Sequence, residues 1–149
     1  MSMQDLIKKL KERPHAEQPE LQEWKEALES LFDEVEAWLA PAVSAGVLTV
    51  RRSESTIAEQ DFGEYPVPVL EISDSKVTIR LEPVGALVVA VVASKGLQGL
   101  RGRVNLVCGP IVIPLVRTAQ GSWKAVPRRG EPCDLNEGSF ASILTEVLL

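Results

Sequence analysis

The chain has 149 residues, of which 16 are Lys or Arg and 21 are Asp or Glu, and its formal net charge is -5. Hydrophobic residues make up 45% and charged residues 25% of the chain, which are values typical of globular proteins and exclude a disordered or fibrous chain. The acidic balance disfavours nucleic-acid and anionic-membrane binding, because both of these partners select basic surfaces. The 5% aromatic content disfavours a surface on which nucleic-acid bases stack.

The N-terminal residues predict a cytoplasmic protein. Asp5, Lys8 and Lys9 fall where a secretory signal would be hydrophobic. The longest apolar run, residues 84–93, has about half the length that a membrane-spanning helix needs. We therefore expect no membrane span.

Residues 1–17 predict a short helix followed by a linker, and residues 18–45 predict a long amphipathic helix. Ser2 and Asp5 have the spacing of a capping box, and Pro14 ends the first helical pattern. In the long helix, apolar residues recur every three or four positions and form one stripe: Leu21, Trp24, Leu28, Leu31, Val35 and Trp38, widened by Phe32 and Leu39. We expect this stripe to be buried, and we expect Pro41 to kink or end the helix.

Between residues 46 and 130 the hydrophobic period changes to two, which predicts an antiparallel sheet. The predicted strands are 48–51, 69–72, 77–82, 86–92, 104–107, 111–116 and 123–126. The run 86–92 is apolar on both faces and therefore predicts a central strand. The polar residues 73–75 predict a hairpin with Ile72 opposite Val77, which places Glu71 diagonal to Arg80 on a solvated face.

Residues 134–149 predict a C-terminal amphipathic helix. Asp134 and Glu137 have capping-box spacing, and apolar residues follow at helical intervals: Phe140, Ile143, Leu144, Val147 and Leu148. Because the helices flank the strands instead of alternating with them, we expect an α+β fold. Its parts, in one domain over residues 1–149, would be a short helix, a long amphipathic helix, a mainly antiparallel multi-stranded sheet and a C-terminal amphipathic helix.

The sequence offers no catalytic constellation. His15 is the only histidine and lies in the predicted linker, where a catalytic imidazole would lack its orienting partners. The glycines between 96 and 102 lead into a strand, whereas a phosphate-binding loop opens a helix. Cys108 and Cys133 have no second Cys or His at metal-ligand spacing, and we interpret them as reduced thiols. We expect no enzymatic activity, no cofactor and no metal.

Charge is segregated along the chain. Residues 1–75 carry 7 basic and 16 acidic groups, residues 76–130 carry 9 basic and 1 acidic, and residues 131–149 carry 4 acidic groups. The acidic and basic regions could pair with each other inside the fold, or they could recognise a protein partner of opposite charge. The candidate partner-binding residues are the basic Arg101, Arg103, Lys124, Arg128 and Arg129, and the stripe residues Trp24, Leu28, Leu31, Phe32 and Trp38.

Three classes of function fit these observations. The first is a non-enzymatic protein-interaction module of bacterial type, either an immunity protein or a dedicated secretion chaperone. The second is a small-ligand or enzymatic domain that binds an anionic substrate through the basic region 101–129. The third is a self-assembling structural protein, and the width of the helical stripe predicts a homodimer.

Overall fold

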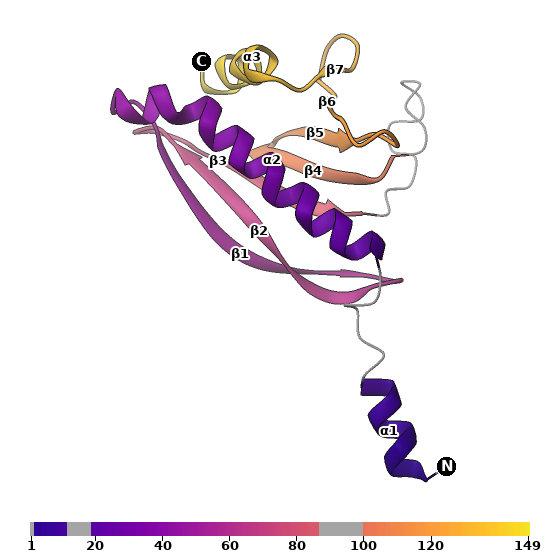
Figure 1. The fold of residues 1–149 in the computed structure, drawn as a ribbon. Coiled ribbons are helices and arrows are strands. Elements are labelled where there is room, and N and C mark those ends of the chain that lie inside the picture. Colours follow the sequence, from indigo (N-terminus) through magenta and orange to yellow (C-terminus); the bar gives the residue numbers. More distant parts are fainter. Residues whose placement is uncertain (1, 12–18, 87–99) are drawn as a thin grey trace.

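The computed structural model describes residues 2–11, 19–86 and 100–149 (Figure 1). Its helices are α1 (Met3–Lys11), α2 (Pro19–Ser44) and α3 (Glu137–Leu148). Its strands are β1 (Thr49–Glu59), β2 (Gly63–Ser73), β3 (Thr78–Gly85), β4 (Gly102–Cys108), β5 (Ile111–Arg117), β6 (Trp123–Ala125) and β7 (Cys133–Asp134). This order confirms the predicted α+β class.

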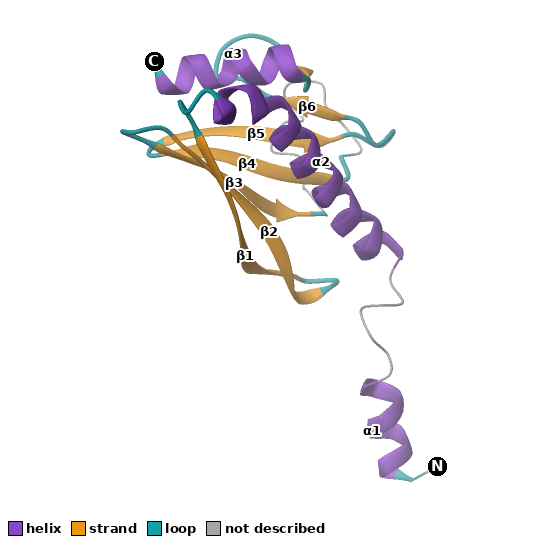
Figure 2. Ribbon diagram, turned by 60° about the vertical axis from the view of Figure 1, so that its left-hand side comes forward, coloured by secondary structure: helices purple, strands orange, loops and turns teal. Residues whose placement is uncertain are grey.

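The described strands form one open sheet in which each strand pairs antiparallel with the next along the chain, from β1 to β7. Figure 2 shows α2 crossing one face of this sheet, with α3 beside the C-terminal end of α2. Most buried side chains of α2, α3 and the strands belong to one large hydrophobic cluster, and Val116 and Val126 form a second, small one. Short antiparallel connections therefore leave the helices to cover one face only.

The apolar stripe of α2 packs against the sheet, as its period predicts. Leu21, Trp24, Leu28, Leu31 and Val35 are at most 2% exposed, whereas Trp38 is half-buried. We expected Pro41 to kink or end the long helix. It does not end the helix, because α2 continues to Ser44. The main-chain N–H of Ala45 still donates to the carbonyl of Pro41, and the turn is completed by Gly46 at a positive φ of 77°.

Strand β1 is much longer than the predicted 48–51. It extends to Glu59 and pairs with β2 throughout its length. Its outer half is mostly polar and exposed, so it carries no alternating pattern for sequence reasoning to find. β3 pairs with β2 only over Leu70–Ser73, so Pro66 and Pro68, which have no main-chain N–H to donate, lie in a part of β2 that β3 does not pair with.

The β2–β3 hairpin has a different register from the predicted one. Ile72 pairs with Ile79, and Glu71 lies directly opposite Arg80. The Asp74 carboxylate accepts the main-chain N–H groups of Lys76 and Val77, both at 2.7 Å, and thereby holds a turn that lies one residue later than predicted, over residues 74–77. Because the register differs by two residues, every side chain keeps its predicted face.

A buried polar contact joins the far end of β1 to the end of β3. The Tyr65 hydroxyl donates to the Glu59 carboxylate, which also accepts the main-chain N–H of Ala86 at 2.8 Å. Burial, and then the hydrogen bond to Glu59, raises the pKa of Tyr65. The predicted central strand 86–92 lies, apart from Ala86, outside the described residues.

The α3 helix begins later than predicted. Its N-cap is Asn136, whose side chain accepts the Ser139 N–H at 2.9 Å, while the Ser139 hydroxyl accepts the Asn136 N–H at 2.9 Å. Asp134 instead lies in β7. The capping box is therefore built from Asn136 and Ser139, not from Asp134 and Glu137.

Candidate interaction groove

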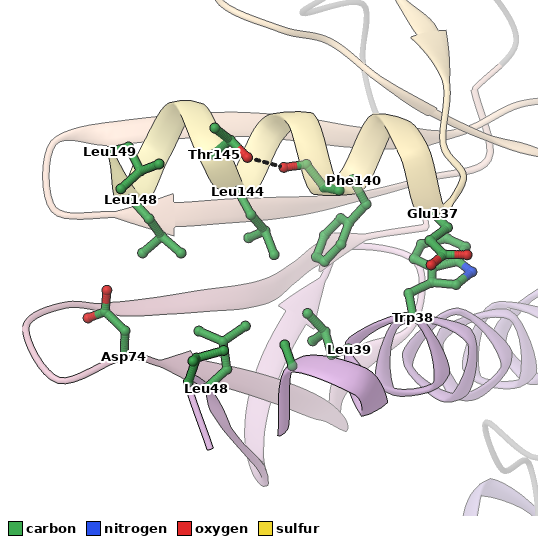
Figure 3. Close-up of a pocket in the computed structure, with 13 residues that line it drawn as sticks. Trp38, Leu39, Leu48, Asp74, Glu137, Phe140, Leu144, Thr145, Leu148 and Leu149 are labelled. Carbon is green, nitrogen blue, oxygen red and sulfur yellow. Dashed lines mark hydrogen bonds between the residues drawn. The ribbon is translucent and has the colours of Figure 1, made fainter. Parts of the chain in front are cut away.

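An apolar pocket of about 380 Å³ lies between the C-terminal end of α2, residues 47 and 48 just before β1, and α3 (Figure 3). In Figure 3, Phe140, Leu144 and Leu148 of α3 point across the pocket towards Leu39 and Leu48. The full set of lining residues is Trp38, Leu39, Ala42, Val47, Leu48, Asp74, Glu137, Phe140, Ala141, Leu144, Thr145, Leu148 and Leu149. Apolar side chains from three elements thus face an open space.

The sequence of α3 explains why this space stays open. Phe140, Ile143 and Leu144 are buried, and the Phe140 ring contacts the Trp38 ring with centroids 5.7 Å apart. Further along the helix, Leu148 is only half-buried. The first turns of α3 are therefore fixed to the core, while its C-terminal end contributes an apolar wall that is not fully covered.

Two further hollows extend this pocket along α2. Trp38 also lines a hollow of about 400 Å³, together with Glu34, Trp123 and Asp134. Glu34 and Trp123 in turn line a third hollow of about 300 Å³, which reaches Glu23 and Arg117. Because neighbouring hollows share residues, we treat the three as one feature and call it the α2–α3 trough.

The trough is apolar at one end and acidic along the rest. Among the described residues, Glu34 and Glu137 form no ion pair. Glu23 pairs with Arg117 at 3.0 Å, and Asp134 pairs with Lys124 at 2.8 Å. At the apolar end, hydrogen bonds from the main chains of Val77 and Lys76 lower the pKa of Asp74, so this side chain is negative at neutral pH. The trough therefore favours cationic groups beside an apolar contact.

Part of the charge segregation is resolved inside the protein. The Arg52 guanidinium on β1 lies within 2.6–3.0 Å of carboxylate oxygens of Glu29, Asp33 and Glu36 on α2, and above the Phe32 ring. Burial lowers the pKa of Arg52, but the hydrogen bonds to Glu36 and Asp33 outweigh burial and raise it overall. The acidic face of α2 is thus partly anchored to the sheet.

The predicted apolar binding residues divide into two groups. Trp24, Leu28, Leu31 and Phe32 are at most 1% exposed, so their side chains lie in the core and not on a free surface. Phe32 and Leu39, which widen the stripe, are also buried in the core. Trp38 is half-buried and lines the trough.

The predicted basic residues do not form one site. Lys124 pairs with Asp134 at the trough, and the Arg103 Nε donates to Asn105 at 2.8 Å, while burial lowers the pKa of Arg103. Arg101, Arg128 and Arg129 are exposed and form no ion pair within the described ranges. None of these three arginines lines one of the four pockets described for residues 2–11, 19–86 and 100–149.

Sequence reasoning found Trp38 but missed most of the trough. Val47 and Ala141 lie at the margins of their apolar stretches, and Glu137 belongs to a capping pattern, so no local signal marked them as a surface. In the described part of the chain, no group of three His, Cys, Asp or Glu side chains is arranged to hold a metal. No described helix is long and apolar enough to cross a membrane.

The chain matches no protein-family model, and no curated protein or solved structure is similar to it.

Proposed function

We propose that this protein is a non-enzymatic protein-binding module, of the immunity-protein or secretion-chaperone kind, and that it binds a basic amphipathic segment of its partner in the α2–α3 trough. The observation that carries this proposal is that an apolar pocket and two acidic hollows adjoin one another along α2, with Trp38 lining both the pocket and the next hollow. Apolar side chains of the partner would fill the pocket. The lysines or arginines of the partner would lie in the acidic hollows beside Glu34.

The two ends of the trough would contribute to binding in different ways. Burying apolar surface supplies most of the affinity of a helix in a groove, at about 25 cal/mol per Å² of area removed from water. The carboxylates then select basic over acidic segments and speed the encounter. Trp38 and Trp123 line the same hollow as Glu34, so their aromatic faces are available to a guanidinium or ammonium group.

This surface favours the first functional class over an anionic small ligand. An anion would meet Glu34 and Asp134 in the trough, and the exposed Arg101, Arg128 and Arg129 line none of the described pockets. Within the basic region, Arg117 lines a described hollow, but it is already paired with Glu23 at 3.0 Å. The basic region therefore offers separate charges and no free cation in a described enclosure.

The test uses two designed helical peptides with the same apolar face, one with lysine and arginine and the other with glutamate and aspartate on its polar face. Fluorescence anisotropy should show that the basic peptide binds at least about tenfold more tightly at low salt, and that added salt narrows this difference. Ala141→Arg places a bulky cation in the pocket wall and should weaken binding about tenfold or more.

The matched control is Ser142→Arg, which adds the same charge to the next residue of α3, outside the trough. It should bind like the unchanged protein. Glu34→Gln should weaken the basic peptide, whereas Glu146→Gln, an exposed α3 residue outside the described pockets, should not. Equal affinity for both peptides, or equal effects of the two arginine substitutions, would contradict the proposal.

A further inference from the structure

Helix α1 carries an apolar stripe that the described part of the chain leaves exposed. Met3, Leu6 and Ile7 occupy positions i, i+3 and i+4, and they are 69%, 40% and 43% exposed. Figures 1 and 2 both show α1 standing apart from the sheet, α2 and α3. Ser2 and Asp5 nonetheless cap the helix reciprocally, as predicted: the Ser2 N–H donates to the Asp5 carboxylate at 3.3 Å, and the Asp5 N–H donates to the Ser2 hydroxyl at 3.2 Å. The stripe is therefore a formed helix face without a partner among the described residues.

The charge of α1 is opposite to that of the trough. Its charged residues are one aspartate and three lysines: Asp5, Lys8, Lys9 and Lys11. Asp74 and Glu137 border the apolar pocket of the trough, and Glu34 lines the next hollow along α2. α1 is thus a basic amphipathic helix, which is the class of segment that the trough is proposed to bind.

Chain length opposes binding of α1 in the trough of its own chain. The seven residues between Lys11 and Pro19 can span at most about 29 Å, even when fully extended. The helical distance from Pro19 to Trp38, where the apolar pocket begins, is itself about 28 Å, so the linker would have to run almost fully extended along α2 before α1, about 14 Å long, could enter the pocket. A trough on another molecule imposes no such limit.

We propose that α1 of one copy binds in the apolar pocket of the α2–α3 trough of a second copy, and that the exchange is reciprocal. This inference rests on the proposed function of the trough. Reciprocal exchange closes the assembly as a symmetric dimer, whereas one-way exchange would leave an open chain of molecules. Met3, Leu6 and Ile7 would enter the pocket, and the lysines of α1 would lie near its acidic border.

The experiment measures the mass of the full-length protein by light scattering over a range of micromolar concentrations. The unchanged chain should have twice its mass of 16.3 kDa. Leu6→Asp in α1 and Ala141→Arg in the trough should each give a monomer. The matched controls, Gln4→Asp on another face of α1 and Ser142→Arg outside the trough, should remain dimeric.

Mixing and crosslinking identify the two surfaces that meet. Leu6→Asp keeps an intact trough and Ala141→Arg keeps an intact α1, so an equimolar mixture should recover part of the dimer. In a Cys133→Ser background, Ile7→Cys on one chain should form a disulfide with Ala141→Cys on another, because the remaining Cys108 is buried.

The outcomes separate this inference from the proposed function. The exchange is overturned if the unchanged chain is a monomer. It is also overturned if the disulfide forms only inside a single chain that carries both Ile7→Cys and Ala141→Cys. If the designed basic peptide still binds in that case, the trough keeps its proposed function. If the peptide fails to bind even the Leu6→Asp chain, whose trough is free, both proposals fail.

Discussion

Gly102→Ala should destabilise the protein, although replacing glycine in a strand usually has the opposite effect. Gly102 begins β4 and lies against the indole of Trp24. A Cβ at this position would be 2.1 Å from Trp24 Cζ3 and 2.7 Å from Cε3, far inside the contact distance of about 3.5–4.0 Å. Trp24 is 1% exposed and its ring centroid is 6.1 Å from that of Trp123, so the indole cannot move without displacing core neighbours.

Two effects of the added methyl group oppose each other. It restricts the unfolded chain, which stabilises the native state by about 0.4–1 kcal/mol. It also overpacks the core, which costs about 1–3 kcal/mol. Since a rigid ring and a paired strand must both shift, we expect overpacking to win by about 1–2 kcal/mol. For a chain of this size, the melting temperature should then fall by roughly 2–8 °C.

Thermal and urea unfolding, followed by circular dichroism, measure this change. The matched control is Gly138→Ala in α3, where the new Cβ would lie 3.4 Å from the Asn136 side-chain oxygen. This control should gain about 0.5–1 kcal/mol, because alanine is the better helix former. In a Trp24→Leu background, which removes the clashing ring atoms, Gly102→Ala should cost less than it does alone. A raised melting temperature for Gly102→Ala, or the same loss in both backgrounds, would refute the packing argument.

Three further outcomes follow from single side chains. Leu28→Ala removes a fully buried side chain between α2 and the sheet and should cost about 2–5 kcal/mol in urea unfolding; an unchanged midpoint would contradict its place in the core. Tyr65→Phe removes a hydrogen bond to the Glu59 carboxylate and should cost about 1.5–3 kcal/mol at neutral pH. Because the pKa of Tyr65 is raised in the folded state, this contribution is complete below its ordinary value of about 10 and is lost as the pH rises above it, so the two unfolding midpoints should converge in alkali. Asp74→Ala removes the carboxylate that holds the β2–β3 turn; since the folded pKa of Asp74 is lowered, the difference from the unchanged protein should be present at pH 7 and should shrink as the pH falls below about 4.

The sequence by itself determined the elements whose side chains repeat with a clear period. The stripe from Leu21 to Trp38 and the spacing of Phe140, Ile143 and Leu144 predict amphipathic helices, because a helix that covers a core must present one apolar face. The reciprocal cap of Ser2 and Asp5 was equally visible, since its partners are three residues apart. Patterns of this kind are local and depend on no distant contact.

Only the tertiary structure decided the register, the extent of β1 and the trough. A shift of two residues in the β2–β3 hairpin buries the same faces, so hydrophobic alternation alone cannot fix the register that the Asp74 side chain selects. The polar outer half of β1 is ordered by its pairing with β2, which no period records. The trough brings Trp38, Val47 and Leu144 together from distant parts of the chain, and its open volume depends on how α3 rests against α2. Local periodicity states which face of each element is apolar, whereas the angle at which two elements meet determines which apolar side chains remain uncovered.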